Sequence, residues 1–83
     1  MEIYVHPRIA QKHPQLSEED IKVAFRNQFM CAQRPTGEYV GVGMDGRCRL
    51  VELVYALERK RANVFHALTP PTNKVLLELQ GKR

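Results

Sequence analysis

The feature that most constrains this chain is an Asp45-Gly46 pair between two apolar runs, residues 39–44 and 48–57. An Asp-Gly turn with positive φ between such runs is the strongest short-range signal of a β-hairpin. A second polar reversal, at residues 58–61, leads into a third apolar run at residues 63–68. The sequence therefore predicts a three-stranded antiparallel meander at the centre of the molecule.

Alternation within the meander indicates how its faces are covered. The long second strand is apolar on both sides, which predicts a central strand buried on both faces or one face that binds another chain. Gly41 and Gly43 leave one side of the first strand nearly bare. Such glycines permit the close approach of a backbone or a ligand, or mark a bulge, and we favour the bulge.

A helix is predicted ahead of the meander, at residues 18–29. Ser17 is a typical N-cap with an acid three residues later, and Leu16 is placed to pack on Ile21. Helical spacing predicts one buried stripe, made of Ile21, Ala24, Phe25, Gln28 and Phe29.

A second, shorter helix is predicted at the end of the chain, at residues 73–80. Thr69 is the expected cap, because proline is tolerated in a first helical turn. Val75, Leu76 and Leu79 form its apolar side, Gly81 follows its end, and Lys82 and Arg83 suit a helix C-terminus.

The other segments are a short edge strand at residues 3–5, a turn or two of helix at residues 8–13 and a strand at residues 30–34. The expected fold is α+β, a three- to four-stranded antiparallel sheet with an amphipathic N-terminal helix and a short C-terminal helix. Five strands result if both outer segments join the sheet.

Length sets the scale of the molecule. The 83 residues form one domain, residues 1–83, with a small core that a homodimer or a partner would help to stabilise. The start of the chain lacks the pattern of a secretion signal, and no apolar run is long enough to span a membrane, so we expect a cytoplasmic location. Cys31 and Cys48 fit no metal spacing and are expected to be reduced thiols, a disulfide between them being the less favoured alternative.

Charge divides the chain unequally. Residues 1–46 hold five Lys and Arg against six Asp and Glu, whereas residues 47–83 hold eight against three. A basic half attracts polyanions, which favours RNA, DNA or an acidic protein as partner. A solvated basic surface without a ligand is the alternative.

One segment resembles a known family. The run Gln11-Lys12-His13-Pro14-Gln15-Leu16-Ser17-Glu18-Glu19-Asp20-Ile21 is similar to the opening of BrnT-like toxins. The Gly46-Arg47 turn and Phe65-His66-Ala67 ahead of a terminal helix match the layout of the same family. The resemblance covers most of the chain.

The resemblance implies a RelE/ParE-type fold and a toxin of a bacterial toxin–antitoxin pair that inhibits translation by cutting RNA. Its partners would be a cognate antitoxin and RNA, free or on the ribosome. Two alternatives remain: a module of the same fold that binds nucleic acid without cutting it, and an interaction protein that receives an acidic partner.

RNA cleavage without a metal or cofactor requires a proton acceptor, a proton donor and cations for the phosphate charge. Four residues are the candidates for catalysis: His66, Arg47, Arg49 and His13. Four more are the candidates for substrate binding: Lys12, Tyr39, Tyr55 and Lys74.

Each candidate also has a purely structural interpretation. A strand histidine is commonly a hydrogen-bonded core residue, turn arginines are often only solvated, and strand tyrosines usually pack. Glu52, in an otherwise apolar strand, could act as a base or pair with an arginine, and we favour the pairing.

Overall fold

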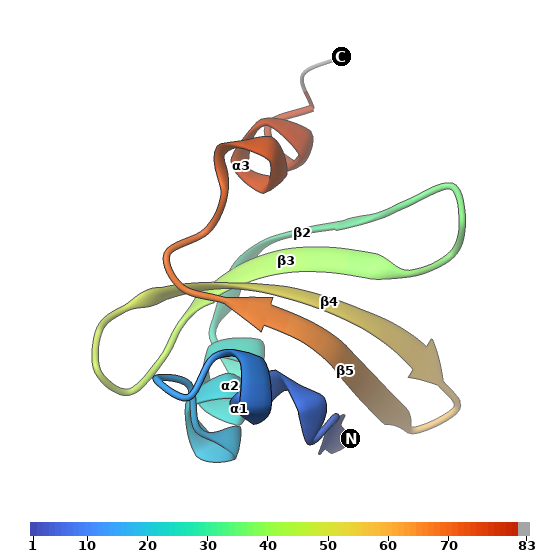
Figure 1. The fold of residues 1–83 in the computed structure, drawn as a ribbon. Helices are drawn as coiled ribbons and strands as arrows, with labels where there is room; N and C mark the ends of the chain where they lie inside the picture. The colour runs from blue at the N-terminus through green and yellow to red at the C-terminus, as the bar shows by residue number, and fades with distance from the viewer. Residues whose placement is uncertain (82–83) are drawn as a thin grey trace.

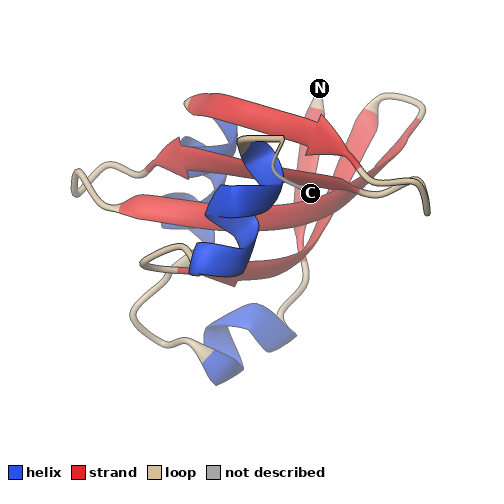
Figure 2. Cartoon of the chain, turned by 90° about the horizontal axis from the view of Figure 1, so that it is seen from above, coloured by secondary structure: helices blue, strands red, loops and turns tan. Residues whose placement is uncertain are grey.

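The computed structural model describes residues 1–81, which form five strands and three helices. Their order is β1 (Glu2–Val5), α1 (Arg8–Lys12), α2 (Glu18–Arg26), β2 (Gln28–Gln33), β3 (Tyr39–Met44), β4 (Leu50–Glu58), β5 (Arg61–Leu68) and α3 (Asn73–Leu79). All strands join one sheet in the order β1-β5-β4-β3-β2. Helices α1 and α2 lie on one face of this sheet and α3 on the other (Figures 1 and 2). None of the helices within residues 1–81 is long and apolar enough to cross a membrane.

The sheet confirms the α+β class and the meander of β3, β4 and β5, but both outer segments join it, which gives five strands, and it is mixed. Strand β1 pairs in parallel with β5, from Glu2 opposite Arg61 to Val5 opposite Val64. The expectation of three to four purely antiparallel strands is therefore wrong. Parallel neighbours need a long connection and no tight turn joins them, so no local signal marks this pair.

The hairpin at Asp45 is confirmed, but its turn differs from the predicted two-residue form. Positive φ occurs at Cys48, with φ of 62°, and not at Gly46. The Asp45 carboxylate explains the longer loop, because its Oδ1 accepts from the backbone N–H groups of Arg47 and Arg49, both at 2.9 Å. These bonds hold the loop open around the side chain.

Helix α2 begins as predicted and ends earlier. The Ser17 hydroxyl accepts from Asp20 N and the Asp20 carboxylate accepts from Ser17 N, both at 3.0 Å, a complete capping box. Gln28 and Phe29 belong to β2 instead of the helix, and Phe29 is 56% exposed at a bulge of that strand. Pairing with β3 thus overrides the helical pattern of these two residues.

Helix α3 packs its predicted apolar side, Val75, Leu76 and Leu79, against the sheet. Its N-cap is Thr72, whose hydroxyl accepts from Val75 N, and not Thr69. The Thr69 hydroxyl instead donates to the Leu50 carbonyl at 2.6 Å. Lys82 and Arg83, expected at the helix end, lie outside the described residues.

Two cores form, one on each face of the sheet. The larger lies under α1 and α2 and includes Leu16, Ile21, Leu53 and Val64, all fully buried. The smaller lies under α3 and consists of Val40, Val42, Val54 and Val75. Strand β4 contributes to both cores, which is the two-sided burial indicated by its sequence.

Gly43 permits a close approach of α2, and the bulge that we favoured lies beside it in β2, where Phe29 is the additional residue between the Gln28–Gly43 and Met30–Val42 pairs. A Cβ atom on Gly43 would overlap the backbone carbonyl of Ala24 in α2. A Cβ atom on Gly41 would overlap the side-chain amide of Gln28. The nearest atom is a backbone atom at Gly43 and a side-chain atom at Gly41, so only Gly43 fixes how near the helix lies to the sheet.

We predict that Gly43→Ala lowers the free energy of unfolding by about 3 kcal/mol, because α2 has to move away from β3. Gly41→Ala is expected to cost about 1 kcal/mol, since the Gln28 side chain can rotate away. Gly46→Ala serves as the control, because nothing lies within 4 Å of its added methyl group. Urea unfolding of the three variants provides the measurement, and a Gly43→Ala protein as stable as the control would contradict this packing.

Candidate functional site

Glu52 is a buried carboxylate in the middle of β4, only 3% exposed, on the face that α3 covers. Its Oε2 lies 2.7 Å from Nε2 of His66 in β5. Its Oε1 accepts from the backbone N–H of Thr72 at 2.8 Å and from the Thr72 hydroxyl at 3.0 Å. One carboxylate therefore connects β4, β5 and the N-cap residue of α3.

A bulge in β5 brings His66 to this carboxylate. Val64 pairs with Tyr55 and faces the core under α2, so strict alternation would turn His66 toward that same core. Phe65 is the additional residue between the two pairs, and His66 then pairs with Val54 on the α3 face. Bulges commonly re-aim a side chain in this way.

The contact with Glu52 defines the state of the imidazole. A carboxylate only accepts hydrogen bonds, so Nε2 of His66 is the nitrogen that donates to Glu52, and in the neutral imidazole Nδ1 is then the acceptor. Within residues 1–81 no group hydrogen-bonds to Nδ1, and the side chain is 40% exposed. His66 is therefore oriented by a buried acid and accessible to a ligand, an arrangement typical of a general base.

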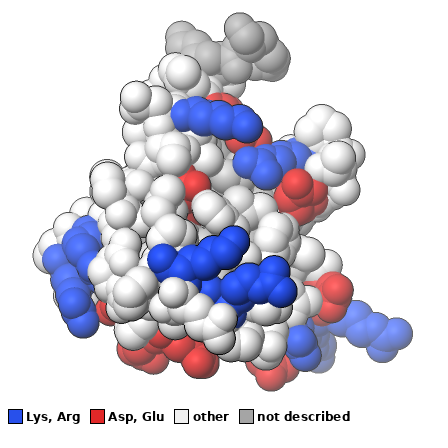
Figure 3. All heavy atoms as spheres, viewed as in Figure 1, with Lys and Arg blue, Asp and Glu red and all other residues white. Residues whose placement is uncertain are grey.

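Two hollows meet at Phe65 and His66. One, of about 310 Å³, extends under α3 and is also lined by Glu52, Thr72 and Lys74. The other, of about 110 Å³, extends along α1 and is also lined by Arg8, Lys12 and His13. Figure 3 shows Lys and Arg side chains in two places on the side of the molecule that faces the viewer. One group lies over α3, and the other lies over the region of α1 and β5.

The structure thus brings together four of the residues singled out in the sequence: His66, His13, Lys12 and Lys74. They come from β5, α1 and α3, which are distant in the sequence. With Arg8, the two lysines place cationic side chains in the two hollows that His66 lines. Such surroundings suit a negatively charged ligand.

Arg49 lies elsewhere, at the β3–β4 turn. Its Nε donates to Asp45 Oδ2 at 2.8 Å, and its terminal nitrogen donates to Asp20 at 3.2 Å and to the Gln15 carbonyl at 3.1 Å. Arg47 lies beside it, 3.8 Å from Asp20, with 65% of its side chain exposed. These arginines connect the turn to the start of α2 and line neither hollow.

The same contacts change the pKa of two carboxyl groups, Asp20 and Asp45. Hydrogen bonds from Ser17, backbone first, lower the pKa of Asp20, while burial opposes them and the two arginines add to the shift. Burial acts most strongly on Asp45 and would raise its pKa, but the hydrogen bonds from Arg49 and Arg47 together outweigh it. Both carboxyls therefore have a pKa below the ordinary value.

The two tyrosines pack under α2, on the opposite face from Glu52. Tyr55 stacks on Tyr39 with ring centroids 5.5 Å apart and meets Phe25 edge-on at 4.8 Å. Burial, with a hydrogen bond to Cys31, raises the pKa of the Tyr55 phenol to about 12. Neither tyrosine lines the hollows beside His66.

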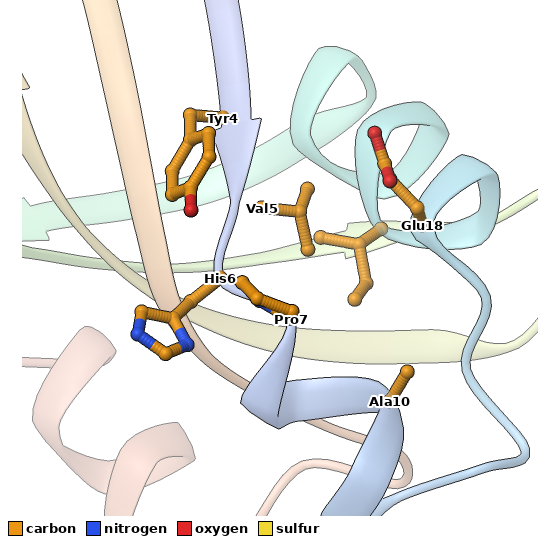
Figure 4. A pocket seen from close by; sticks show the side chains of 7 residues that line it. Tyr4, Val5, His6, Pro7, Ala10 and Glu18 are labelled. Carbon is orange, nitrogen blue, oxygen red and sulfur yellow. The ribbon is translucent and has the colours of Figure 1, made fainter.

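A third cavity, of about 370 Å³, lies between β1, α1 and α2 and is mostly apolar. Val5, His6 and Ala10 are among the residues that line it, and the ring of His6 extends from the chain on the opposite side to the Val5 side chain (Figure 4). Both cysteines are free thiols. Within residues 1–81, His, Cys, Asp and Glu side chains form no group of three or more that could hold a metal ion.

Sequence reasoning missed four residues of the site: Glu52 as the partner of His66, Thr72, Arg8 and Phe65. A signal existed for Glu52, an acid with apolar neighbours on both sides in β4, but the arginine favoured as its partner is in fact a histidine. No comparable signal marks Phe65, because its position depends on the bulge.

Comparisons of the chain with protein-family models, with curated proteins and with solved structures found no match. Membership of the BrnT-like family therefore stays a prediction from the sequence motif. The functional argument rests on the side chains themselves.

We predict that Arg49→Ala lowers the free energy of unfolding by about 2–3 kcal/mol, because it leaves the fully buried Asp45 side chain without its cation. Arg47→Ala is the matched control at the same turn. It is expected to cost less than about 0.5 kcal/mol, since its ion pair is long and exposed. If chemical denaturation shows equal losses of unfolding free energy for the two variants, Arg49 does not anchor the turn.

Stability is also expected to depend on pH through Asp20 and Asp45. A carboxyl with a lowered pKa in the folded protein stabilises it above the unfolded pKa, about 4, and this contribution is lost as pH falls through the folded value. The free energy of unfolding should therefore decrease from pH 6 to pH 3. Asp45→Asn should be less stable at pH 6 and should show a weaker pH dependence, and an unchanged dependence would exclude Asp45 as a source.

Proposed function

We propose that this protein is a metal-independent endoribonuclease, and that it acts as the toxin of a bacterial toxin–antitoxin pair. The observation that carries the proposal is the Glu52–His66 pair, with its 2.7 Å contact, where two cation-lined hollows meet. The motif of residues 11–21 supports it independently. The pair supplies the proton acceptor and the hollows supply the phosphate site.

The proposed step is an in-line attack within the RNA. Nδ1 of His66 takes the proton of a ribose 2′-hydroxyl while its oxygen forms a bond to the adjacent phosphorus. The bond from phosphorus to the 5′-oxygen breaks, and that oxygen receives a proton from His13 or Lys12. The products are a 2′,3′-cyclic phosphate and a 5′-hydroxyl end.

Glu52 has two roles in this step. It holds Nε2 so that Nδ1 is the acceptor, and its charge stabilises the imidazolium that forms. Thr72 fixes the carboxylate through two hydrogen bonds to Oε1, which keeps Oε2 directed at the ring. Thr72 is therefore a positioning residue.

Cations on both sides of the imidazole stabilise the additional negative charge of the pentacoordinate phosphate. Arg8 and Lys12 lie on α1, and Lys74 lies on α3. All three residues are exposed, and within residues 1–81 none of them forms an ion pair. A cognate antitoxin with an acidic surface would cover this face and block access to His66.

We predict that His66→Gln lowers the rate of RNA cleavage at least about a hundredfold, because the proton acceptor is lost. Glu52→Gln should do the same. The amide that replaces the carboxylate has one N–H₂ group, which faces either Nε2–H of His66 or the two donors of Thr72. The first orientation favours the wrong tautomer of His66, and the second sets donor against donor. Cleavage of cellular RNA in the presence of a chelator is the assay, with the protein purified free of any partner and the unfolding midpoint confirming each fold.

Three further measurements separate the alternatives. Lys12→Ala should weaken cleavage, whereas Arg26→Ala, which removes an exposed cation from α2, should not. Cutting that depends on Arg47 and survives His66→Gln would place the site at the β3–β4 turn. If the native protein binds RNA in a salt-dependent manner but never cuts it, the chain is a binding module and the enzyme proposal fails.

A further inference from the structure

Phe65 is an exposed aromatic residue beside the candidate base. It is 49% exposed, although it follows the fully buried Val64 and precedes His66. The bulge removes it from the alternation that places Val64 in the core. Its side chain joins neither core cluster, so packing within the described chain does not account for an aromatic residue here.

The surroundings of Phe65 are cationic on two sides. It lines the hollow that holds Arg8, Lys12 and His13, and it also lines the hollow that holds Lys74. A ring with cations on either side is the arrangement with which proteins hold single-stranded nucleic acid, because bases stack on rings while cations bind the phosphates.

We propose that the ring of Phe65 is a stacking platform for one unpaired base of a single-stranded RNA. The inference rests on the proposed function, whose substrate class it narrows. The RNA backbone passes from the α1 hollow to the α3 hollow across the edge of β5, and the stacked base places the adjoining ribose next to His66. A base within a duplex is already stacked between its neighbours and cannot use the ring.

The chain offers a matched control in Phe29, which is also exposed, at 56%, and also lies at a bulge. Phe29 belongs to β2, and strands β3 and β4 separate it from β5 in the sheet. Phe65→Leu and Phe29→Leu therefore remove the same ring from similar exposed positions. Phe65→Tyr retains the ring at the proposed platform.

The test measures binding and not cutting. A fluorescein-labelled oligonucleotide with 2′-O-methyl riboses lacks the nucleophile, so its dissociation constant is obtained by anisotropy without cleavage. Phe65→Leu should raise that constant about tenfold for the single strand, since one base–ring stack is lost. The dissociation constants of Phe65→Tyr and Phe29→Leu should stay within about twofold of the native value. The affinity for a blunt-ended duplex of the same oligonucleotide should not depend on Phe65.

A second measurement uses the native protein and avoids any effect of substitution on folding. Irradiation of a single strand that carries 5-iodouridine should cross-link its base to Phe65, identified by mass spectrometry. Cross-links found only at other residues would overturn the proposal. The proposal also fails if the native protein does not bind the single strand. It fails as well if Phe29→Leu weakens single-strand binding as much as Phe65→Leu does, or if Phe65→Leu weakens duplex binding equally.

The two proposals can fail separately. Binding that depends on Phe65 without cleavage of any natural RNA would reject the enzyme and retain the platform. Cleavage that His66→Gln abolishes and Phe65→Leu leaves unchanged, together with unchanged single-strand binding, would retain the enzyme and reject the platform.

Discussion

The burial of the Glu52 carboxylate is the constraint on which the site depends. A carboxylate that is 3% exposed needs hydrogen-bond donors around both oxygens, and residues 1–81 supply them from β5 and from the start of α3. The same contacts position the helix. Val75, one turn into α3, lies over the small core because Thr72 is held at Glu52 and caps the helix. Fold and site thus share one carboxylate.

Buried acids on the two faces of the sheet are satisfied by different partners. On the α2 face, Asp20 and Asp45 bind Arg49, a guanidinium that stays charged at any pH a protein tolerates. That pairing has no proton to exchange, which suits an anchor. On the α3 face the partner of Glu52 is His66, and an imidazole is a group that can accept and release a proton during catalysis.

Local signals in the sequence predicted local structure well. The capping box at Ser17 and the hairpin at Asp45 depend on residues within five positions, and both occur. The parallel pairing of β1 with β5 depends on segments far apart in the chain, and it was missed. The site follows the same rule: His66 was identified by its residue type, but Arg49 has the same appearance in the sequence whether it binds phosphate or two carboxylates. Only the contacts distinguish these roles.

The position of the site also follows from where β1 stops. Val5 pairs with Val64, and the His6 N–H donates to the Val64 carbonyl at 2.9 Å, after which the chain turns into α1. Strand β5 continues to Leu68, so within residues 1–81 no strand pairs with the outer edge of its second half. The bulge at Phe65 lies at the start of this unpaired stretch. A regular strand paired on both edges has little room for an extra residue, so the early end of β1 is what allows the bulge to expose Phe65 and turn His66 to Glu52.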